Sequence, residues 1–372
     1  MQNLHSRSVT SSLYRMIFVC FGSTVLVIFL ISCSTSIPVQ QKSQRFENDT
    51  LAVQYSILFI IHGDGDYLYH DTSGNEHLAD EEVLASAKRI AEKNPSAEVF
   101  IFHQKPRSHF LFFFPLRDGE FFYYRNGHLF ANELYWRDNK LSSLDTEVEF
   151  YKSFRAKNQR NIVSMFLYFG HELPEFGGTG YDASYPDRAF TLRDLASGLK
   201  GFTSDSTKFD LLVLSTCYGG TPYTIGMLGT YARTIIASPD NLHLSYFDLN
   251  SLENLDLGLK DRDVPAFAER FAYQSFERLT NEIQTTVSVT VYDVDCVQEY
   301  LKSVYTTYEN TLDTLYDKKK DFPATVGHCD CADIPAYALP TMDHGVNVFY
   351  RPALFGRSKS KQNHSGWECW KD

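Results

Sequence analysis

Two apolar runs that each end at a reactive side chain constrain this sequence most. Residues 162–169 form a strand-like run that stops at Gly170, directly before His171. A second apolar run, residues 209–216, leads straight into Cys217 and a turn of small residues. Continuous apolar runs of this kind are typical of strands that are buried on both faces of a parallel sheet. If the two strands are parallel neighbours, His171 and Cys217 emerge at the same edge of the sheet, where open α/β folds place their sites.

The rest of the chain alternates between strand and helix patterns, which predicts an α/β fold with a mostly parallel central sheet. A strand at 55–61, a helix at 80–93 and a strand at 97–103 make a βαβ unit. The dipeptides Asp118-Gly119 and Asn126-Gly127 are typical of tight turns and predict a β-hairpin insertion within residues 108–136. A helix at 220–232 is expected to begin directly after Cys217. Further helices are predicted at 144–157, 191–200 (capped by Thr191), 265–283 and 295–316, and further strands at 234–237, 285–292 and 345–350.

The N-terminus has the pattern of an export signal. Arg7 and Arg15 precede an apolar run at residues 16–31, and Ser32-Cys33 follows it. A basic segment, an apolar segment and a small residue before the cut are typical of a secretory signal, and a cysteine directly after the cut resembles a bacterial lipobox. We therefore expect residues 1–32 to be removed and Cys33 to carry a lipid. An uncleaved anchor is the alternative, although the run is short for a span of about 20 residues.

This interpretation predicts a protein of the bacterial cell envelope that is lipid-anchored through Cys33, at the outer membrane, facing the periplasm or the exterior. Residues 33–54 are polar and are expected to form a flexible tether. Residues 55–262 are predicted to form the main domain, and residues 263–372 an αβ extension packed on the same core.

Charge and cysteine content narrow the possible partners. The 372-residue chain has a formal charge of −11, which becomes −13 once the signal with its two arginines is removed. Such a surface argues against nucleic acid as a partner.

Five cysteines remain besides Cys20 and Cys33, and we expect Cys217 to stay free. The other four allow three disulfide pairings, and the sequence does not choose between them. These four are Cys296, Cys329, Cys331 and Cys369.

A metal site is a weaker interpretation of the segment around the Cys-X-Cys pair. His328, Cys329, Asp330 and Cys331 offer zinc ligands within a short span, but a second ligand pair is missing. Disulfides are the commoner use of cysteine in exported proteins. We therefore expect no metal and no cofactor.

Cys217 and His171 are the candidate catalytic pair. A thiolate attacks carbonyl groups well, and it forms at neutral pH when its pKa is lowered from about 8.5 by a helix N-terminus or an imidazolium. His171 would act as general acid and base, and backbone N–H groups near Glu172 and Cys217 would bind the oxyanion. Taken alone, a cysteine at a strand end is more often a small buried hydrophobic residue.

The order of these segments resembles the clostripain-like cysteine peptidases, of the clan that also holds caspases, legumains and gingipains. The resemblance starts from Phe169-Gly170-His171, continues through the Gly-rich residues 176–182 and the helix start at 191–195, and includes Leu214-Ser215-Thr216-Cys217. It extends into residues 236–239, 290–293 and 345–352. It implies a caspase-like α/β/α sandwich and a cysteine endopeptidase with a Cys217–His171 dyad, acting on peptides or proteins.

Two positions depart from the family's pattern. Glu172 replaces the glycine after the histidine, although its backbone N–H would remain if the chain keeps the same path. Ser215 stands where clostripain-like enzymes carry the acidic residue that selects Arg or Lys at the cut, so the resemblance does not imply basic specificity. Asp182, Asp187 or Glu172 could supply a substitute charge in the substrate pocket.

Two other functions compete on the same residues. Ser215 to Gly219 has the spacing of a nucleophile elbow, which would make the protein an α/β-hydrolase with a cysteine nucleophile. In that fold the base would be His328, His344 or His364, and His171 would be idle. The third hypothesis is a surface-anchored binding module that keeps a caspase-like scaffold but has lost activity.

Overall fold

The structure is a computed structural model that describes residues 52–371, except residues 64–67, 71–73, 112, 138–142, 157–161, 176–189, 204–206, 243–245, 260–261, 305, 307–326, 335–343 and 357–359. The predicted signal, Cys33 and almost all of the tether lie outside the described residues, as does Asp182. Thr50–Asp372 forms one compact unit. Among the described residues, no helix combines the length and hydrophobicity needed to cross a bilayer.

A nine-stranded mixed sheet runs through the unit in the order β14-β12-β11-β10-β9-β1-β4-β7-β8. Its five central strands are parallel, and the two strands at either edge are antiparallel to their neighbours. This confirms the predicted α/β class with a mostly parallel sheet. The strands are β1 (Tyr55–His62), β4 (Ala97–Gln104), β7 (Gly119–Arg125), β8 (His128–Tyr135), β9 (Val163–Phe169), β10 (Phe209–Ser215), β11 (Ala232–Ala237), β12 (Val287–Asp293) and β14 (Val346–Arg351).

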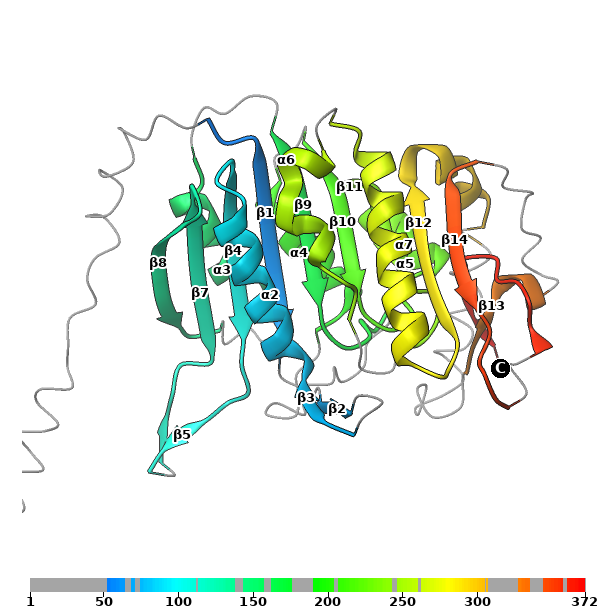
Figure 1. The fold of residues 1–372 in the computed structure, drawn as a ribbon, viewed down its shortest axis with the longest axis horizontal. Coiled ribbons are helices and arrows are strands. Elements are labelled where there is room, and N and C mark those ends of the chain that lie inside the picture. The colour runs from blue at the N-terminus through cyan, green and yellow to red at the C-terminus, as the bar shows by residue number, and fades with distance from the viewer. Residues whose placement is uncertain are drawn as a thin grey trace, which may run out of the picture. The chain divides into compact units, whose positions relative to one another are not determined.

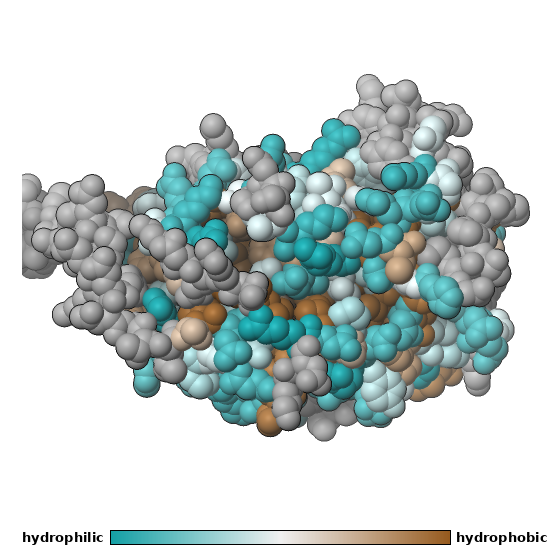
Figure 2. Space-filling model, turned by 90° about the horizontal axis from the view of Figure 1, so that it is seen from above, coloured by the Kyte–Doolittle hydropathy of each residue, from teal (hydrophilic) through white to brown (hydrophobic). Residues whose placement is uncertain are grey.

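Helices cover both faces of this sheet (Figure 1). On one face lie α2 (Ala79–Lys93), α6 (Leu255–Gly258) and α7 (Val264–Glu282), and on the other α3 (Asp145–Phe154), α4 (Leu192–Phe202) and α5 (Pro222–Leu228). Figure 2, which looks along the sheet from one end, shows hydrophobic residues in a middle band between two hydrophilic layers. The central strands are mostly apolar because helices bury both of their faces.

The local patterns account for these elements. The strands of the parallel core are almost wholly buried, as a run without polar alternation requires. Helix α4 begins with a capping box, in which Thr191 and Asp194 bind each other's backbone N–H, as the predicted Thr191 cap implies. The α7 helix opens with the Asp263 cap and Pro265 in its first turn.

The predicted antiparallel hairpin is present and is formed by β7 and β8. Strand β7 pairs with β4 and β8 pairs with β7, so the hairpin extends the central sheet at one edge. Asn126 and Gly127 form the expected tight turn, with φ angles of 53° and 73°. Asp118-Gly119 is not a hairpin turn, because the buried Asp118 carboxylate accepts hydrogen bonds from the backbone and the guanidinium of Arg137.

Three two-stranded sheets accompany the central one: β2 (Leu68–His70) with β3 (Glu76–Leu78), β5 (His109–Phe110) with β6 (Phe114–Pro115), and β13 (Gly327–Asp330) with β15 (Glu368–Lys371). The described residues also form two 3-10 helices, η3 (Asn250–Asn254) and η4 (Cys331–Asp333), and a helical stretch at residues 294–304. The third small sheet lies beside the carboxyl ends of the parallel strands and bears on the site described next.

Candidate active site

Adjacent parallel strands carry His171 and Cys217. Strands β9 and β10 pair in parallel, with Phe169 opposite Ser215. His171 and Cys217 therefore each lie two residues beyond a registered pair, at the same edge of the sheet. The backbone N–H of Gly170 donates to the carbonyl oxygen of Ser215 at 3.4 Å, so the two chains are still joined one residue before the histidine. The predicted strand neighbourhood is thus confirmed.

The turn at Cys217 is held by the loop after β11. The Cys217 thiol donates to Oδ1 of Asn241, with Sγ and Oδ1 3.2 Å apart. The next residue, Tyr218, has a φ of 51°, and its N–H donates to the carbonyl oxygen of Asp240 at 3.2 Å. The N–H of Gly220 donates to the carbonyl oxygen of Ser238 at 3.1 Å. This loop therefore helps to determine where the Cys217 thiol lies.

The helix predicted directly after Cys217 begins later and is shorter. Helix α5 runs from Pro222 to Leu228, and Thr221 is its N-cap. The carbonyl oxygen of Gly220 accepts the N–H of Glu368, and the N–H of Thr224 is capped by the Thr221 hydroxyl, so the helix begins after Thr221. The dipole of α5 is strongest within its first turn and is therefore not available directly at Cys217.

His328 joins the histidine loop to the cysteine turn. Its ring stacks on the ring of Tyr218, with centroids 3.6 Å apart and planes 3° from parallel. Its Nε2 lies 3.3 Å from Oε1 of Glu172. Burial raises the pKa of Tyr218 to about 12, with the negative field of Cys217 as the next cause, so its hydroxyl stays protonated at neutral pH. The side chain of Glu172 thus faces His328.

Glu175 connects its own loop to two further segments of this edge. Its Oε1 accepts hydrogen bonds from the hydroxyls of Thr221 and Thr224, the latter at 2.9 Å. Its Oε2 accepts from the indole N–H of Trp370 at 3.0 Å. Glu175 is buried and follows the histidine loop, so one carboxylate links that loop to helix α5 and to β15.

Ser215 lies inside the protein. Only 8% of its surface is exposed, and its hydroxyl accepts a hydrogen bond from the backbone N–H of Phe247 at 3.1 Å. It lines a small apolar cavity together with Phe169, Val213 and Tyr246. The cavity wall beside Ser215 is therefore apolar.

The C-terminal small sheet packs on the cysteine turn. The N–H of Glu368 donates to the carbonyl oxygen of Gly220 at 3.1 Å. A disulfide joins Cys331 and Cys369, whose Cα atoms are 4.9 Å apart, which answers the question of pairing that the sequence left open. The expectation that four cysteines pair is wrong, since Cys296 and Cys329 are free thiols along with Cys217. Cys329 lies opposite Cys369 in the strand register, but Cys369 is already bonded to Cys331.

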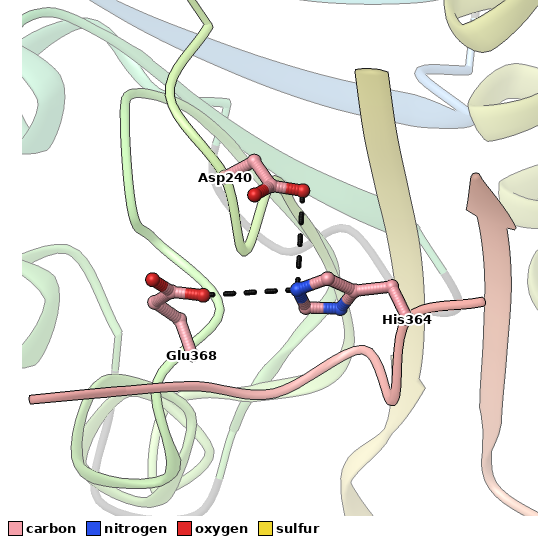
Figure 3. Close-up of side chains that lie close together, drawn as sticks. All are labelled: Asp240, His364 and Glu368. Atoms are coloured by element: carbon pink, nitrogen blue, oxygen red, sulfur yellow. Dashed lines mark ion pairs between the residues drawn. The ribbon is translucent and has the colours of Figure 1, made fainter. Parts of the chain in front are cut away.

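A cluster of acidic side chains surrounds His364 where this small sheet meets the β11 loop (Figure 3). Its Nε2 lies 3.7 Å from Oε2 of Glu368, 3.8 Å from Oδ2 of Asp330 and 3.9 Å from Oδ2 of Asp240. Within the described part of the chain, Asp240, His364 and Glu368 have the spacing of a metal site.

The hydrogen bonds of the His364 ring do not fit a metal ligand. Its Nδ1 accepts the backbone N–H of Gly366 at 3.0 Å, so in the neutral ring the proton is on Nε2. The nitrogen that faces the carboxylates then has no lone pair for a metal. Burial raises the pKa of Glu368 to about 7, so this cluster holds protons near neutral pH.

The residues that reasoning from sequence missed come from distant segments. Asn241 and Glu175 carry no local pattern that separates them from ordinary loop residues. The sequence suggests His328 as a zinc ligand or as the base of an α/β-hydrolase, and neither role predicts its stacking on Tyr218. A signal for Asn241 existed in its position after a short strand and Ser238-Pro239, since strand ends at a common edge meet.

Comparison with known proteins gives neighbours among solved structures. No family model matches the sequence, and no curated protein matches it. The chain is similar to an inactive zymogen C11 protease from Parabacteroides distasonis, with a TM-score of 0.47 and 16% identity over 70% of this chain and 67% of that one. It is also similar to a secreted C11 cysteine protease from Bacteroides thetaiotaomicron bound to an irreversible peptide inhibitor, with a TM-score of 0.46 and 12% identity over 70% of each chain. These neighbours are cysteine proteases of the clostripain-like family, whose motifs the sequence resembles.

Proposed function

We propose that this chain is a cysteine endopeptidase that hydrolyses peptide bonds through Cys217 and His171. The observation that supports it most is the register of β9 and β10, which brings the thiol and the imidazole to one edge of the sheet from adjacent strands. A nucleophile and its base have to be within hydrogen-bond reach in the substrate complex, and neighbouring strands about 4.8 Å apart allow that.

The proposed reaction follows from this arrangement. His171 takes the proton of Cys217, and the thiolate sulfur attacks the carbonyl carbon of the peptide bond. The carbonyl oxygen becomes an oxyanion, for which the backbone N–H groups of Glu172 and Cys217 are the proposed donors. The intermediate expels the amine, which receives its proton from His171, and water then hydrolyses the thioester.

The proposed substrate pocket borders Ser215. Ser215 carries no charge, so this position offers no acidic group to select Arg or Lys beside the cut. Asp182 remains a proposed second contributor from a segment outside the described residues.

A catalytically impaired binding module is the second candidate, and one contact favours it. The thiol of Cys217 donates to an amide oxygen of Asn241, which stabilises the neutral thiol relative to the thiolate. An α/β-hydrolase mechanism has less support, because a nucleophile elbow leads directly into a helix and α5 starts only at Pro222.

The test compares variants of the chain from Val53 onward, which keeps every described strand and helix. We expect wild-type protein to cleave a mixed peptide library, and Cys217→Ala and His171→Ala to lose that cleavage. Cys296→Ala is the matched control, because Cys296 is an exposed free thiol whose pKa is raised by its hydrogen bond to Asp293. Cleavage that survives Cys217→Ala would refute the peptidase.

Labelling distinguishes the binding module. A peptidyl chloromethylketone should modify Cys217 faster than Cys296 and Cys329 if Cys217 is activated. Equal labelling of the three thiols, with no cleavage by wild type, would support a module without activity.

We further propose that the mature protein is anchored to the bacterial cell envelope by a lipid on Cys33. The support is the lipobox-like segment of the sequence. Mass spectrometry of the N-terminal peptide from cells should find a diacylated Cys33, and an unmodified or uncleaved N-terminus would contradict the anchor.

A further inference from the structure

A two-stranded arm made by β5 and β6 exposes large apolar side chains. Figure 1 shows this arm extending beyond the ends of β4 and β7, away from the layered body. Phe113 is 82% exposed, Leu111 62% and Phe110 58%. Phe114 and Leu116 are exposed as well. Contiguous exposed apolar residues of this kind mark a surface that binds something apolar.

The arm has a defined structure that holds these side chains outward. The N–H of Phe113 donates to the carbonyl oxygen of Phe110 at 3.3 Å, and the N–H of Leu116 donates to that of Ser108 at 2.8 Å. Leu111 adopts a φ of 49°, in the left-handed region that a tight tip requires. The apolar tip is thus built into a hairpin.

The base of the arm is fixed to the body of the protein. The N–H of Lys105 donates to the carbonyl oxygen of Asp118 at 2.7 Å. The guanidinium of Arg137 pairs with the Asp118 carboxylate at 3.1 Å and donates to the carbonyl oxygen of Lys105 at 3.0 Å. Asp118 and Arg137 are buried, so their contacts fix the direction in which the arm extends from the central sheet.

The charges of the arm oppose those of the whole chain. Residues 105–117 contain Lys105, Arg107, His109 and Arg117 and no acidic residue, whereas the chain has a formal charge of −11. The Lys105 ammonium pairs with Glu120 at 2.7 Å, so the positive charge of the arm lies mainly on its two arginines. Arg117 also bonds the carbonyl oxygen of Leu134 at 2.7 Å, an uncharged partner that leaves the guanidinium charge uncompensated. Basic side chains beside an apolar tip are complementary to anionic lipid head groups above an acyl layer.

The edge strand beside the arm continues the apolar surface. Leu134 and Trp136, at the end of β8, are both exposed, and Arg117 connects the arm to Leu134. Tryptophan is enriched at the level of lipid head groups. A convex, aromatic tip with basic flanks fits a deformable bilayer surface better than the rigid pocket of a protein.

We infer that the β5–β6 arm inserts its tip into the surface of a membrane that contains anionic lipids. The inference is independent of the proposed peptidase and of the lipid on Cys33. It predicts that the protein without its N-terminal segment still binds bilayers, and that the arm sets which edge of the sheet faces them.

The test uses the chain from Val53 onward and vesicles of phosphatidylcholine with or without phosphatidylglycerol. We expect cosedimentation with the anionic vesicles, weaker with pure phosphatidylcholine and weaker at high salt. Phe113→Ser should reduce binding about tenfold or more, because it removes one inserted aromatic ring. Leu257→Ser is the matched control, since Leu257 is 80% exposed on α6, and it should bind like wild type.

Three outcomes would overturn the inference. In the first, wild-type protein binds neither kind of vesicle. In the second, Phe113→Ser binds as well as wild type. In the third, wild-type protein binds both lipid compositions equally. Self-association that Phe113→Ser abolishes, without vesicle binding, would instead assign the arm to contacts between copies of this chain. Phe110→Ser is a second variant in case Phe113→Ser misfolds, and circular dichroism confirms the fold of each.

Discussion

Replacing Glu368 by Gln should make the protein more stable at alkaline pH and change little at acid pH. Glu368 is buried at the junction of the small C-terminal sheet and the β11 loop, 3.7 Å from the His364 ring. Asp240 and Asp330 face the same ring. Removing the solvent from a carboxylate beside other carboxylates favours its protonated form, and glutamine mimics that form in shape and charge.

The size of the effect follows from the pKa. Burial raises the pKa of Glu368 from 4.5 to about 7. The folded protein therefore binds this proton more tightly than the unfolded chain does, and stability is lost as the pH rises from about 4.5 to about 7. Above that range the cost levels off at about 3 kcal/mol, at 1.36 kcal/mol for each pKa unit. Glu368→Gln avoids this cost.

The assay is urea unfolding of the oxidised protein between pH 5 and pH 9, read from tryptophan fluorescence. The difference between Glu368→Gln and wild type should be near zero at about pH 5 and approach about 3 kcal/mol at about pH 8.5. Glu269→Gln, which changes an exposed glutamate on α7, controls for the loss of one charge. A variant that is equal to wild type at all pH values, or less stable by a constant amount, would refute the reasoning.

Three other predictions concern the site edge and its supports. Asn241→Ala should speed alkylation of Cys217 at neutral pH by removing an oxygen that stabilises the thiol, and Asn241→Asp should slow it; the reverse order, followed by mass spectrometry, would contradict this role. Replacing Cys331 and Cys369 by Ser should lower the free energy of unfolding by about 3–4 kcal/mol, because their bridge closes a loop with a sequence separation of 38, and reductant should then affect wild type but not the variant. Thr191→Ala should cost about 1 kcal/mol by removing the capping box of α4, with Thr191→Ser close to wild type in the same unfolding measurement.

The parallel core could be predicted because its residues carry local signals. Buried central strands are mostly apolar, so the bounds of β1, β9 and β10 agree with the runs in the sequence to within one or two residues. The cap at Thr191 and the turn at Asn126-Gly127 are also local, because each depends on residues within one turn of chain.

The predictions from sequence that were wrong depend on contacts between distant residues, which local patterns do not indicate. Asp118-Gly119 has the composition of a turn, but Arg137 binds Asp118 and draws it into the interior. The segment after Cys217 has a helical pattern from Gly220, but the N–H of Glu368 in β15 binds the carbonyl oxygen of Gly220, and the helix begins at Pro222. In both cases a distant partner outweighed a local preference.

By itself, the sequence determined the α/β class and the strands that end at His171 and Cys217. Only the tertiary structure decided that β7 and β8 extend the main sheet, that Asn241 binds the cysteine, and that Cys331 pairs with Cys369. The physical reason is the range of the interactions. Burial and capping leave a periodic or short-range signature in the chain, whereas a hydrogen bond or a disulfide between distant segments depends on how the sheet brings those segments together.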